Sequence, residues 1–211
     1  MNALKNEELA KDKILQVAAE LFAQSGLDGV STRDIARVAD LNVSLISYYF
    51  GGKEGLYRAI IQNFAHQAQS RVDALLAEFE PEFLTAQSFR EALRRLVLGI
   101  LELKTGSPAV AAILQREIVA QLPYAREIYE TVFIHVGEKL VGFIKKAQTK
   151  KIVRADIHPY VFFMLLVESI NGYSFAMKAD TQFCEKCISL VDDKEQFIDQ
   201  VIKIFSQGIE I

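Results

Sequence analysis

Residues 31–55 have the sequence STRDIARVADLNVSLISYYFGGKEG, which predicts two short helices joined by a tight turn and followed at once by a third helix. Ser31 and Asp34 have the spacing of a capping box, in which each side chain satisfies an unpaired amide at the start of a helix. Asp40 is a short polar residue that tolerates the left-handed conformation needed to end this helix. The pattern therefore predicts a helix-turn-helix, an arrangement that suits binding to DNA.

The second short helix has the features of a recognition helix. Asn42 is predicted to cap it, and Ile46 and Phe50 are its natural inward residues. Residues 42–52 carry no charge, so nothing there repels a phosphate backbone, and small or hydrogen-bonding side chains cluster on this segment. Lys53 then starts the next helix, where its ammonium group and the free backbone amides both favour a phosphate.

The strings STRDIA and YYFGGKEGLY within this region resemble the TetR family of one-component bacterial transcription regulators. The resemblance is specific over residues 10–61, and beyond them it rests on length and helical pattern. Two positions depart from the family pattern: Asp40 stands where Gly is usual, and Ser47 stands where Tyr is usual. The first change is compatible with a turn, whereas the second bears on the contacts with bases and phosphates.

The resemblance implies an all-α protein. An N-terminal three-helix helix-turn-helix DNA-binding domain is expected at residues 1–52, and a larger helical ligand-binding and dimerisation domain at residues 53–211. Apolar spacing and the positions of Gly and Pro predict the helices in more detail, and no strand alternation interrupts them. The predicted helices cover about residues 6–25, 53–80, 88–104, 108–121, 123–148, 159–178 and 194–207.

The resemblance also implies roles for single positions of the helix-turn-helix domain, which we call the reader. Thr32, Tyr48, Tyr49 and Lys53 match phosphate-contacting positions, and Arg33, Val43, Ser44 and Leu45 match positions that reach or flank base edges. Arg33 is the only guanidinium able to engage a guanine edge, and Val43 or Leu45 can contact thymine methyl groups. Taken singly, each residue could instead be packed or merely solvated, but the ordered set favours DNA binding. The candidate DNA contacts are Thr32, Arg33, Asn42, Val43, Ser44, Leu45, Ser47, Tyr48, Tyr49 and Lys53.

Composition limits the classes of function. The chain has 211 residues, of which 51% are hydrophobic, so it can bury a substantial core. Its 24 basic and 27 acidic residues give a net charge of -3, which argues against a polycation that coats nucleic acid. Any DNA binding must therefore be local, and an ordinary acidic globular protein is the alternative that composition alone favours.

Location and cysteine chemistry follow from short segments. The N-terminal MNALKNEELAKDK lacks the apolar core of a signal peptide, and the apolar run Val161–Val167 is far shorter than the roughly 18 residues of a membrane span. We therefore expect a cytoplasmic protein without membrane contact. Cys184 and Cys187 form a C-x-x-C pair that could be redox-active or half of a metal site, but no second pair completes it. An incidental pair is favoured, and neither a metal nor a cofactor is expected.

The larger domain shows no catalytic constellation. His66, His135 and His158 lie on different segments, without a Ser, Cys or carboxylate pair at diagnostic spacing, so an enzyme is the weaker class. The resemblance implies instead a small-molecule effector, whose binding moves the long helix that follows the reader. The aromatic-rich composition favours a lipophilic or aromatic ligand, although polar residues on helices often have local partners instead. The candidate lining residues are Phe64, His66, Gln115, His135, Glu168, Asn171 and Tyr173.

The last two long helices carry more apolar surface than one neighbour can cover. They can pack within their own domain, but the resemblance favours a homodimer in which they pair with their copies as a four-helix interface. A dimer of such readers binds two half-sites roughly 34 to 36 Å apart, so a palindromic operator is expected. The candidate interface residues are Phe162, Leu166, Phe197, Val201, Ile204 and Phe205.

The sequence thus predicts a ligand-responsive, homodimeric DNA-binding regulator. Repression, with release of the operator when a largely apolar molecule binds, rests on the resemblance alone. The alternative is a helical small-molecule-binding or interaction protein whose reader has lost its affinity for DNA, through Ser47 and the acidic residues Asp28, Asp34 and Asp40. An enzyme built on a helical bundle is a second alternative, which a copurifying metal or cofactor would reveal.

Overall fold

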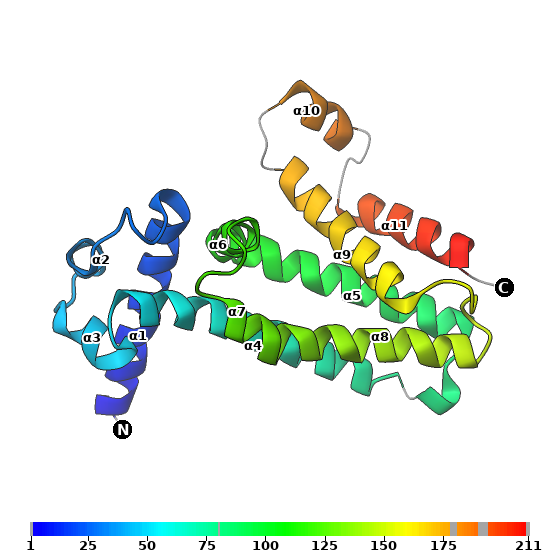
Figure 1. Ribbon diagram of the computed structural model, residues 1–211, viewed down its shortest axis with the longest axis horizontal. Coiled ribbons are helices and arrows are strands. Elements are labelled where there is room, and N and C mark those ends of the chain that lie inside the picture. Colours follow the sequence, from blue (N-terminus) through cyan, green and yellow to red (C-terminus); the bar gives the residue numbers. More distant parts are fainter. Residues whose placement is uncertain (1, 80, 178–180, 190–193, 210–211) are drawn as a thin grey trace. The chain divides into compact units, whose positions relative to one another are not determined.

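The computed structural model describes residues 2–79, 81–177, 181–189 and 194–209. Within these ranges every regular element is a helix, and no β-strand occurs (Figure 1). The predicted all-α class is therefore confirmed.

The first helix begins at Asn2 rather than at the predicted Asn6, and the other helices follow the predicted boundaries closely, with two differences. The segment predicted as one helix from 123 to 148 begins with a short helix and a π-helical turn, and a short helix that was not predicted precedes the last one. The elements are α1 (Asn2–Ser25), α2 (Thr32–Ala39), α3 (Ser44–Phe50), α4 (Lys53–Ala77), a 3-10 turn (Pro81–Phe83), α5 (Ala86–Gly106), α6 (Pro108–Val119), α7 (Arg126–Ile128), the π-helical turn (Tyr129–Phe133), α8 (Ile134–Thr149), α9 (Pro159–Ala176), α10 (Gln182–Ser189) and α11 (Lys194–Ile209).

The chain forms two compact units. Unit 1 contains Met1–Gln67 and Ser107–Phe133, and unit 2 contains Ala68–Gly106 and Ile134–Ile211. Helix α4 begins in unit 1 and ends in unit 2. These two units do not coincide with the predicted domains, whose boundary lies after Gly52. That boundary separates the expected DNA-binding domain from the expected ligand-binding and dimerisation domain, and it stays a prediction.

Unit 1 holds the helix-turn-helix against α1. Apolar residues of α1 recur every three or four positions, so they form one stripe that the neighbouring helices bury. Ring contacts reinforce this core: Phe22 lies edge-on to Tyr57 of α4, with 5.3 Å between the ring centroids. The residues of unit 1 that are completely buried are Ile14, Ala18, Phe22, Ile35, Ala39, Ile46, Leu56, Ile61, Ala65, Ile113 and Ala125.

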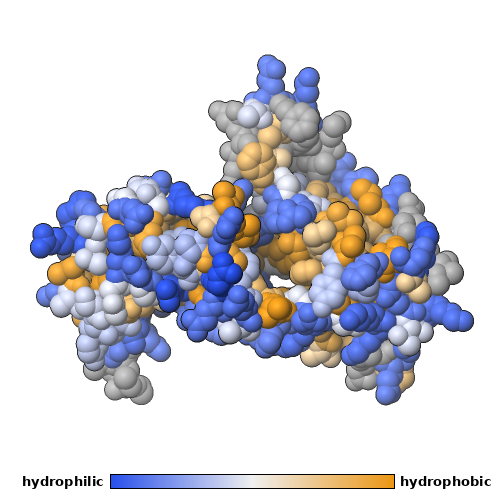
Figure 2. Space-filling model, viewed as in Figure 1, coloured by the Kyte–Doolittle hydropathy of each residue, from blue (hydrophilic) through white to orange (hydrophobic). Residues whose placement is uncertain are grey.

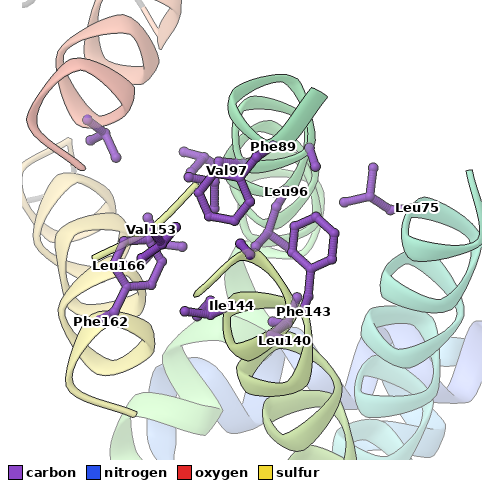
Figure 3. Packing of buried hydrophobic residues seen from close by; sticks show 14 of the residues in the cluster. Leu75, Phe89, Leu96, Val97, Leu140, Phe143, Ile144, Val153, Phe162 and Leu166 are labelled. Atoms are coloured by element: carbon purple, nitrogen blue, oxygen red, sulfur yellow. The ribbon is translucent and has the colours of Figure 1, made fainter. Parts of the chain in front are cut away.

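The core of unit 2 is formed by α5, α8, α9 and α11 with the end of α4. Figure 3 shows Leu75, Phe89, Leu96 and Phe143 pointing toward one another from α4, α5 and α8. Phe89 stacks on Phe143 with 5.5 Å between the ring centroids. Burying each such side chain contributes about 1.5–3 kcal/mol, so this cluster is a main source of the stability of unit 2.

Three predicted dimer residues belong to this core. Phe162, Leu166 and Val201 are at most 4% exposed in the single chain, so no surface remains on them to contact a second copy. Their assignment to a dimer interface stays a prediction, one that their burial in this core does not favour. Phe197 and Phe205 are half-buried and packed against the same core, whereas Ile204 is exposed.

Membrane-spanning potential is limited in the described part of the chain. No single helix there has both the length and the apolar character to cross a membrane, although the bent pair α5 and α6 would qualify if its two helices were counted together. Cys184 is buried on α10, while the side chain of Cys187 lies outside the described residues, so the role of the C-x-x-C pair stays untested.

Candidate nucleic-acid interface

Helix α2 begins with the predicted capping box. The Ser31 hydroxyl accepts a hydrogen bond from the Asp34 amide at 3.1 Å, and the Asp34 carboxylate accepts one from the Ser31 amide at 3.2 Å. Hydrogen bonds from the Ser31 side chain, and then from its backbone, lower the pKa of Asp34. Two of the amides that a helix start leaves unpaired are thus satisfied, which fixes where α2 begins.

The turn between α2 and α3 confirms the role of Asp40 and corrects that of Asn42. Asp40 adopts the left-handed conformation, with φ 50° and ψ 50°, at the end of α2. Helix α3 starts at Ser44 with Val43 in the capping position, so the predicted cap was one residue too early. The Asn42 carboxamide still satisfies this helix end, because its oxygen accepts from the Ser44 amide at 2.9 Å and from the Ser44 hydroxyl at 2.8 Å.

Helix α3 turns a polar, uncharged face to solvent. Ile46 is completely buried, as predicted, while Phe50 is only half-buried. Tyr48 is 78% exposed, which excludes the alternative that its ring is packed beneath the helix. Among the ten candidate DNA contacts, those exposed are Arg33, Asn42, Val43, Ser44, Ser47 and Tyr48, and those half-buried are Thr32, Leu45, Tyr49 and Lys53.

Glycines fix the junction between α3 and α4. Gly52 has φ 115°, a value that side chains of L-residues rarely allow. A Cβ atom built on Gly55 would lie 1.8 Å from the carbonyl oxygen of Phe50, so only glycine fits against the end of α3. The FGGKEG string therefore sets the position of Lys53 relative to α3.

Lys53 and Thr32, two predicted phosphate positions, meet in one depression. The Lys53 ammonium donates to the Leu27 carbonyl oxygen at 2.9 Å, which holds it in place and leaves further N–H groups for a ligand. The depression has a volume of about 440 Å³. Its lining residues are Asp28, Gly29, Val30, Ser31, Thr32, Asp34 and Lys53. The two carboxylates at this site oppose a phosphate, whereas Lys53 and the start of α2 favour one.

A buried carboxylate that the sequence analysis missed joins α6 to α4. Glu117 is 2% exposed and accepts hydrogen bonds from the Tyr57 hydroxyl and from the Tyr124 and Ala125 amides, all at 3.0 Å. Burial, and secondly the Glu117 charge, raise the pKa of Tyr57. We call Glu117 and these three partners the Glu117 hub. No sequence signal marks it, because its partners lie on other segments of the chain.

The adjacent Arg116 ties α6 to the end of α1. Its guanidinium donates to the Phe22 carbonyl oxygen at 2.7 Å and to the Ala23 carbonyl oxygen at 3.1 Å. These carbonyls belong to the last turn of α1, a helix end that favours a positive charge. The Phe22 carbonyl oxygen also accepts from the Gly26 amide at 2.9 Å. Arg116 and the Glu117 hub thus hold α6 against the helices that carry the reader.

The candidate effector residues are divided between the two units. Phe64 is buried in unit 1, His66, Gln115, His135 and Glu168 are exposed, and Asn171 and Tyr173 are half-buried. Glu168 and Asn171 lie together, because the Asn171 amide donates to the Glu168 carboxylate at 3.1 Å. An open depression of about 650 Å³ lies elsewhere in unit 2, and none of the seven residues lines it. The effector site stays a prediction. Among the described residues, no three His, Cys, Asp or Glu side chains cluster as metal ligands would.

Comparison with known sequences agrees with the helix-turn-helix geometry. Residues 14–60 match the signature of "Bacterial regulatory proteins, tetR family". The chain is 35% identical over 121 residues to the probable HTH-type transcriptional regulator YttP of Bacillus subtilis, a match that covers 57% of this chain and 56% of YttP. It is 30% identical over 171 residues to the HTH-type transcriptional repressor NicS of Pseudomonas putida, covering 77% of this chain and 76% of NicS.

Solved structures share the fold along most of the chain. The ketosteroid transcriptional regulator KstR2 of Mycobacterium tuberculosis superposes with a TM-score of 0.71 at 19% identity, over 95% of both chains. The TetR family transcriptional regulator PfmR of Thermus thermophilus superposes with a TM-score of 0.71 at 17% identity, over 94% of this chain and 99% of PfmR. These likenesses extend the agreement from the reader to the helices beyond it.

Proposed function

The chain belongs to the TetR family of bacterial regulatory proteins, and from this membership we propose that it is a cytoplasmic homodimer that represses transcription until a small molecule releases it from DNA. As a member of this family it is a ligand-responsive DNA-binding transcription regulator and not an enzyme. The main observation that supports the proposed DNA contacts is the uncharged, exposed face of α3. Thr32 at the start of α2 and Lys53 at the start of α4 also line one depression.

In this proposal α3 enters the major groove. The exposed Val43 and Ser44 lie at its start, where a recognition helix contacts base edges, and Arg33 stands on α2. Thr32, Tyr48 and Lys53 bind phosphates, which positions α3 but reads no sequence directly. Because α3 carries no charged side chain, base identity depends on hydrogen bonds from small groups and on apolar contacts with thymine methyl groups.

The proposed dimer uses α9 and α11 through a different set of residues from those the sequence suggested. Residues of α9 spaced three or four apart are exposed, and most of them are apolar, which is unusual for a surface that stays in water. Figure 2 shows apolar patches in the region where Figure 1 labels α9. This stripe consists of Val161, Met164, Leu165, Glu168, Gly172 and Phe175, and Ile204 is an exposed apolar residue of α11.

We propose a small, largely apolar effector because unit 2 is rich in aromatic and aliphatic side chains. Such a molecule shifts the protein away from DNA only by binding the released form more tightly than the DNA-bound form. A shift from 1:99 to 99:1 requires a difference in affinity of about 10⁴-fold. Arg116 and the Glu117 hub are the contacts through which a change in α6 would reach the reader.

Selection of duplexes from a random pool tests this function. The wild-type protein is expected to enrich an inverted repeat whose half-sites lie one helical turn, about 10–10.5 base pairs, or a multiple of it apart. Met164→Asp places a charge on the α9 stripe and is expected to abolish dimers in sedimentation and to lose the repeat. Val119→Asp is the matched control, because Val119 is an exposed apolar residue of α6 outside the proposed interface. Recovery of no enriched sequence by the wild-type protein would favour the alternative of a reader without DNA affinity.

A further inference from the structure

The DNA reader has few positive charges to offer to a phosphate backbone. Residues 1–52 contain five basic side chains, Lys5, Lys11, Lys13, Arg33 and Arg37, against seven acidic ones, Glu7, Glu8, Asp12, Glu20, Asp28, Asp34 and Asp40. Lys53 adds one cation at the start of α4, and α3 itself has none. Affinity for DNA depends mainly on neutralised phosphates, so the position of each cation matters.

One of these cations lies beside the tyrosines of the recognition helix although it belongs to α1. The Lys11 ammonium is 4.8 Å from the centroid of the Tyr49 ring. Tyr49 in turn lies edge-on to Tyr48, with 5.0 Å between the ring centroids. The pKa of Lys11 is raised, first by its hydrogen bond to Glu7 and to a smaller extent by Tyr49 and Tyr48. Lys11 therefore supplies positive charge to the end of α3, where α3 has none.

The present partner of Lys11 is easily exchanged. Its ammonium lies 2.9 Å from the Glu7 carboxylate, one helical turn earlier on α1, and both side chains are partly exposed. Exposed ion pairs of this kind contribute little to stability, because water screens them and two flexible side chains must be ordered. A DNA phosphate can therefore replace Glu7 at little cost.

We propose that Lys11 is a further phosphate-binding residue of the DNA site, reaching the backbone from α1 beside Tyr48 and Tyr49. The proposal rests on the proposed function, since it requires that α3 meets DNA. Glu7 then acts as a competitor: it holds the ammonium in the free protein and releases it to the phosphate in the complex.

A different role for Lys11 would be to hold the Tyr49 ring in place. A cation over an aromatic face attracts it, and this contact persists whether or not DNA is bound. The two roles differ in their dependence on salt. A phosphate contact releases counterions, so its loss makes the affinity less sensitive to salt, whereas loss of a positioning contact weakens binding equally at all salt concentrations.

Fluorescence anisotropy with a selected duplex at several salt concentrations separates these roles. Lys11→Gln is expected to reduce the slope of log affinity against log salt by about 0.9 for each Lys11 engaged, hence by about 1.8 for a dimer on two half-sites. Lys11→Arg is expected to keep the wild-type slope, and Glu7→Gln to bind more tightly than wild type. Lys13→Gln is the matched control, because Lys13 is exposed on the same helix and two positions away.

The outcomes are distinct. A slope that is unchanged in Lys11→Gln, or changed equally in Lys13→Gln, overturns the assignment of Lys11 while leaving DNA binding itself intact. Weaker binding with an unchanged slope shows the positioning role and also overturns it. Wild-type protein that shows no salt-dependent binding overturns the proposed function and this inference together. Circular dichroism and urea unfolding of each variant establish that the folds are the same.

Discussion

Removing the Tyr57 hydroxyl tests whether the Glu117 hub stabilises unit 1. Tyr57→Phe deletes one oxygen and keeps the ring, whose edge-on contacts with Phe22 and Tyr124 have centroid distances of 5.3 and 5.6 Å. The lost hydrogen bond is to a buried carboxylate, and such bonds contribute about 1.5–3 kcal/mol. In this variant Glu117 still accepts hydrogen bonds from the Tyr124 and Ala125 amides, so its buried carboxylate keeps two of its three partners. We expect the free energy of unfolding to fall by about 2 kcal/mol, roughly a 30-fold increase in the unfolded fraction.

Urea unfolding measures this change, and a double-mutant cycle assigns it. If the hydroxyl acts through Glu117, Tyr57→Phe and Glu117→Gln together cost less than the sum of the two, by about 1–2 kcal/mol. Tyr48→Phe is the matched control, because it removes a hydroxyl from an exposed tyrosine and is expected to leave the urea midpoint unchanged. A Tyr57→Phe midpoint equal to that of wild type, or strict additivity in the cycle, would refute the view that the hub stabilises the fold.

Three further changes probe other parts of the chain. Leu101→Ala removes a completely buried side chain from the core of unit 2 and is expected to cost about 2–5 kcal/mol in urea unfolding, while the exposed Leu165→Ala costs far less. Gly55→Ala forces a Cβ against the Phe50 carbonyl and is expected to lower DNA affinity at least tenfold, whereas Gly99→Ala, with no atom near the new Cβ, leaves it unchanged. The pKa of Asp34 is lowered below its ordinary 3.8, so its carboxylate adds stability above that pH and loses it as the pH falls through the lower folded value. Asp34→Asn should therefore flatten the acid limb of stability against pH below about 4, and an unchanged acid limb would contradict the capping box.

The local signals of the helix-turn-helix were predictable because their causes lie within a few residues. The capping pair Ser31 and Asp34, the left-handed Asp40 and the inward Ile46 each depend on neighbours in the same turn or helix. Even the misplaced cap at Asn42 was wrong by one residue only, because its side chain still satisfies the start of α3. Helix caps and turns of this kind depend on a few adjacent residues, so a short stretch of sequence predicts them.

Contacts between distant segments were not predictable. Tyr57 and Glu117 are 60 positions apart, and Arg116 reaches carbonyls 94 and 93 positions earlier. No spacing rule connects residues so far apart in the sequence. A single glutamate on an apolar helix also does not indicate by itself whether its side chain is buried or exposed. Lys11 was missed for the same reason, since its position beside Tyr49 depends on how α1 packs against the reader.

The difference between the expected and the observed exposed face of α9 has another cause. This helix is apolar on all sides, so its sequence does not indicate which face points into the core. Phe162 and Leu166 were assigned to the dimer interface, but the core buries them and leaves Val161, Met164 and Leu165 outside. The prediction identified the helix correctly as one with excess apolar surface, but the exposed part of that surface is the face of Val161, Met164 and Leu165.

The central claim is that α3 and the residues around it bind a two-fold symmetric DNA site. The most direct test is the affinity of wild-type and Lys53→Ala protein for a selected duplex, and for the same duplex with one half-site scrambled, at several salt concentrations. We predict two protomers per intact duplex, a loss of affinity on scrambling, and a salt slope about 0.9 smaller for each Lys53 removed from the complex. Equal affinity for both duplexes, with the same slope in wild type and Lys53→Ala, would contradict the claim.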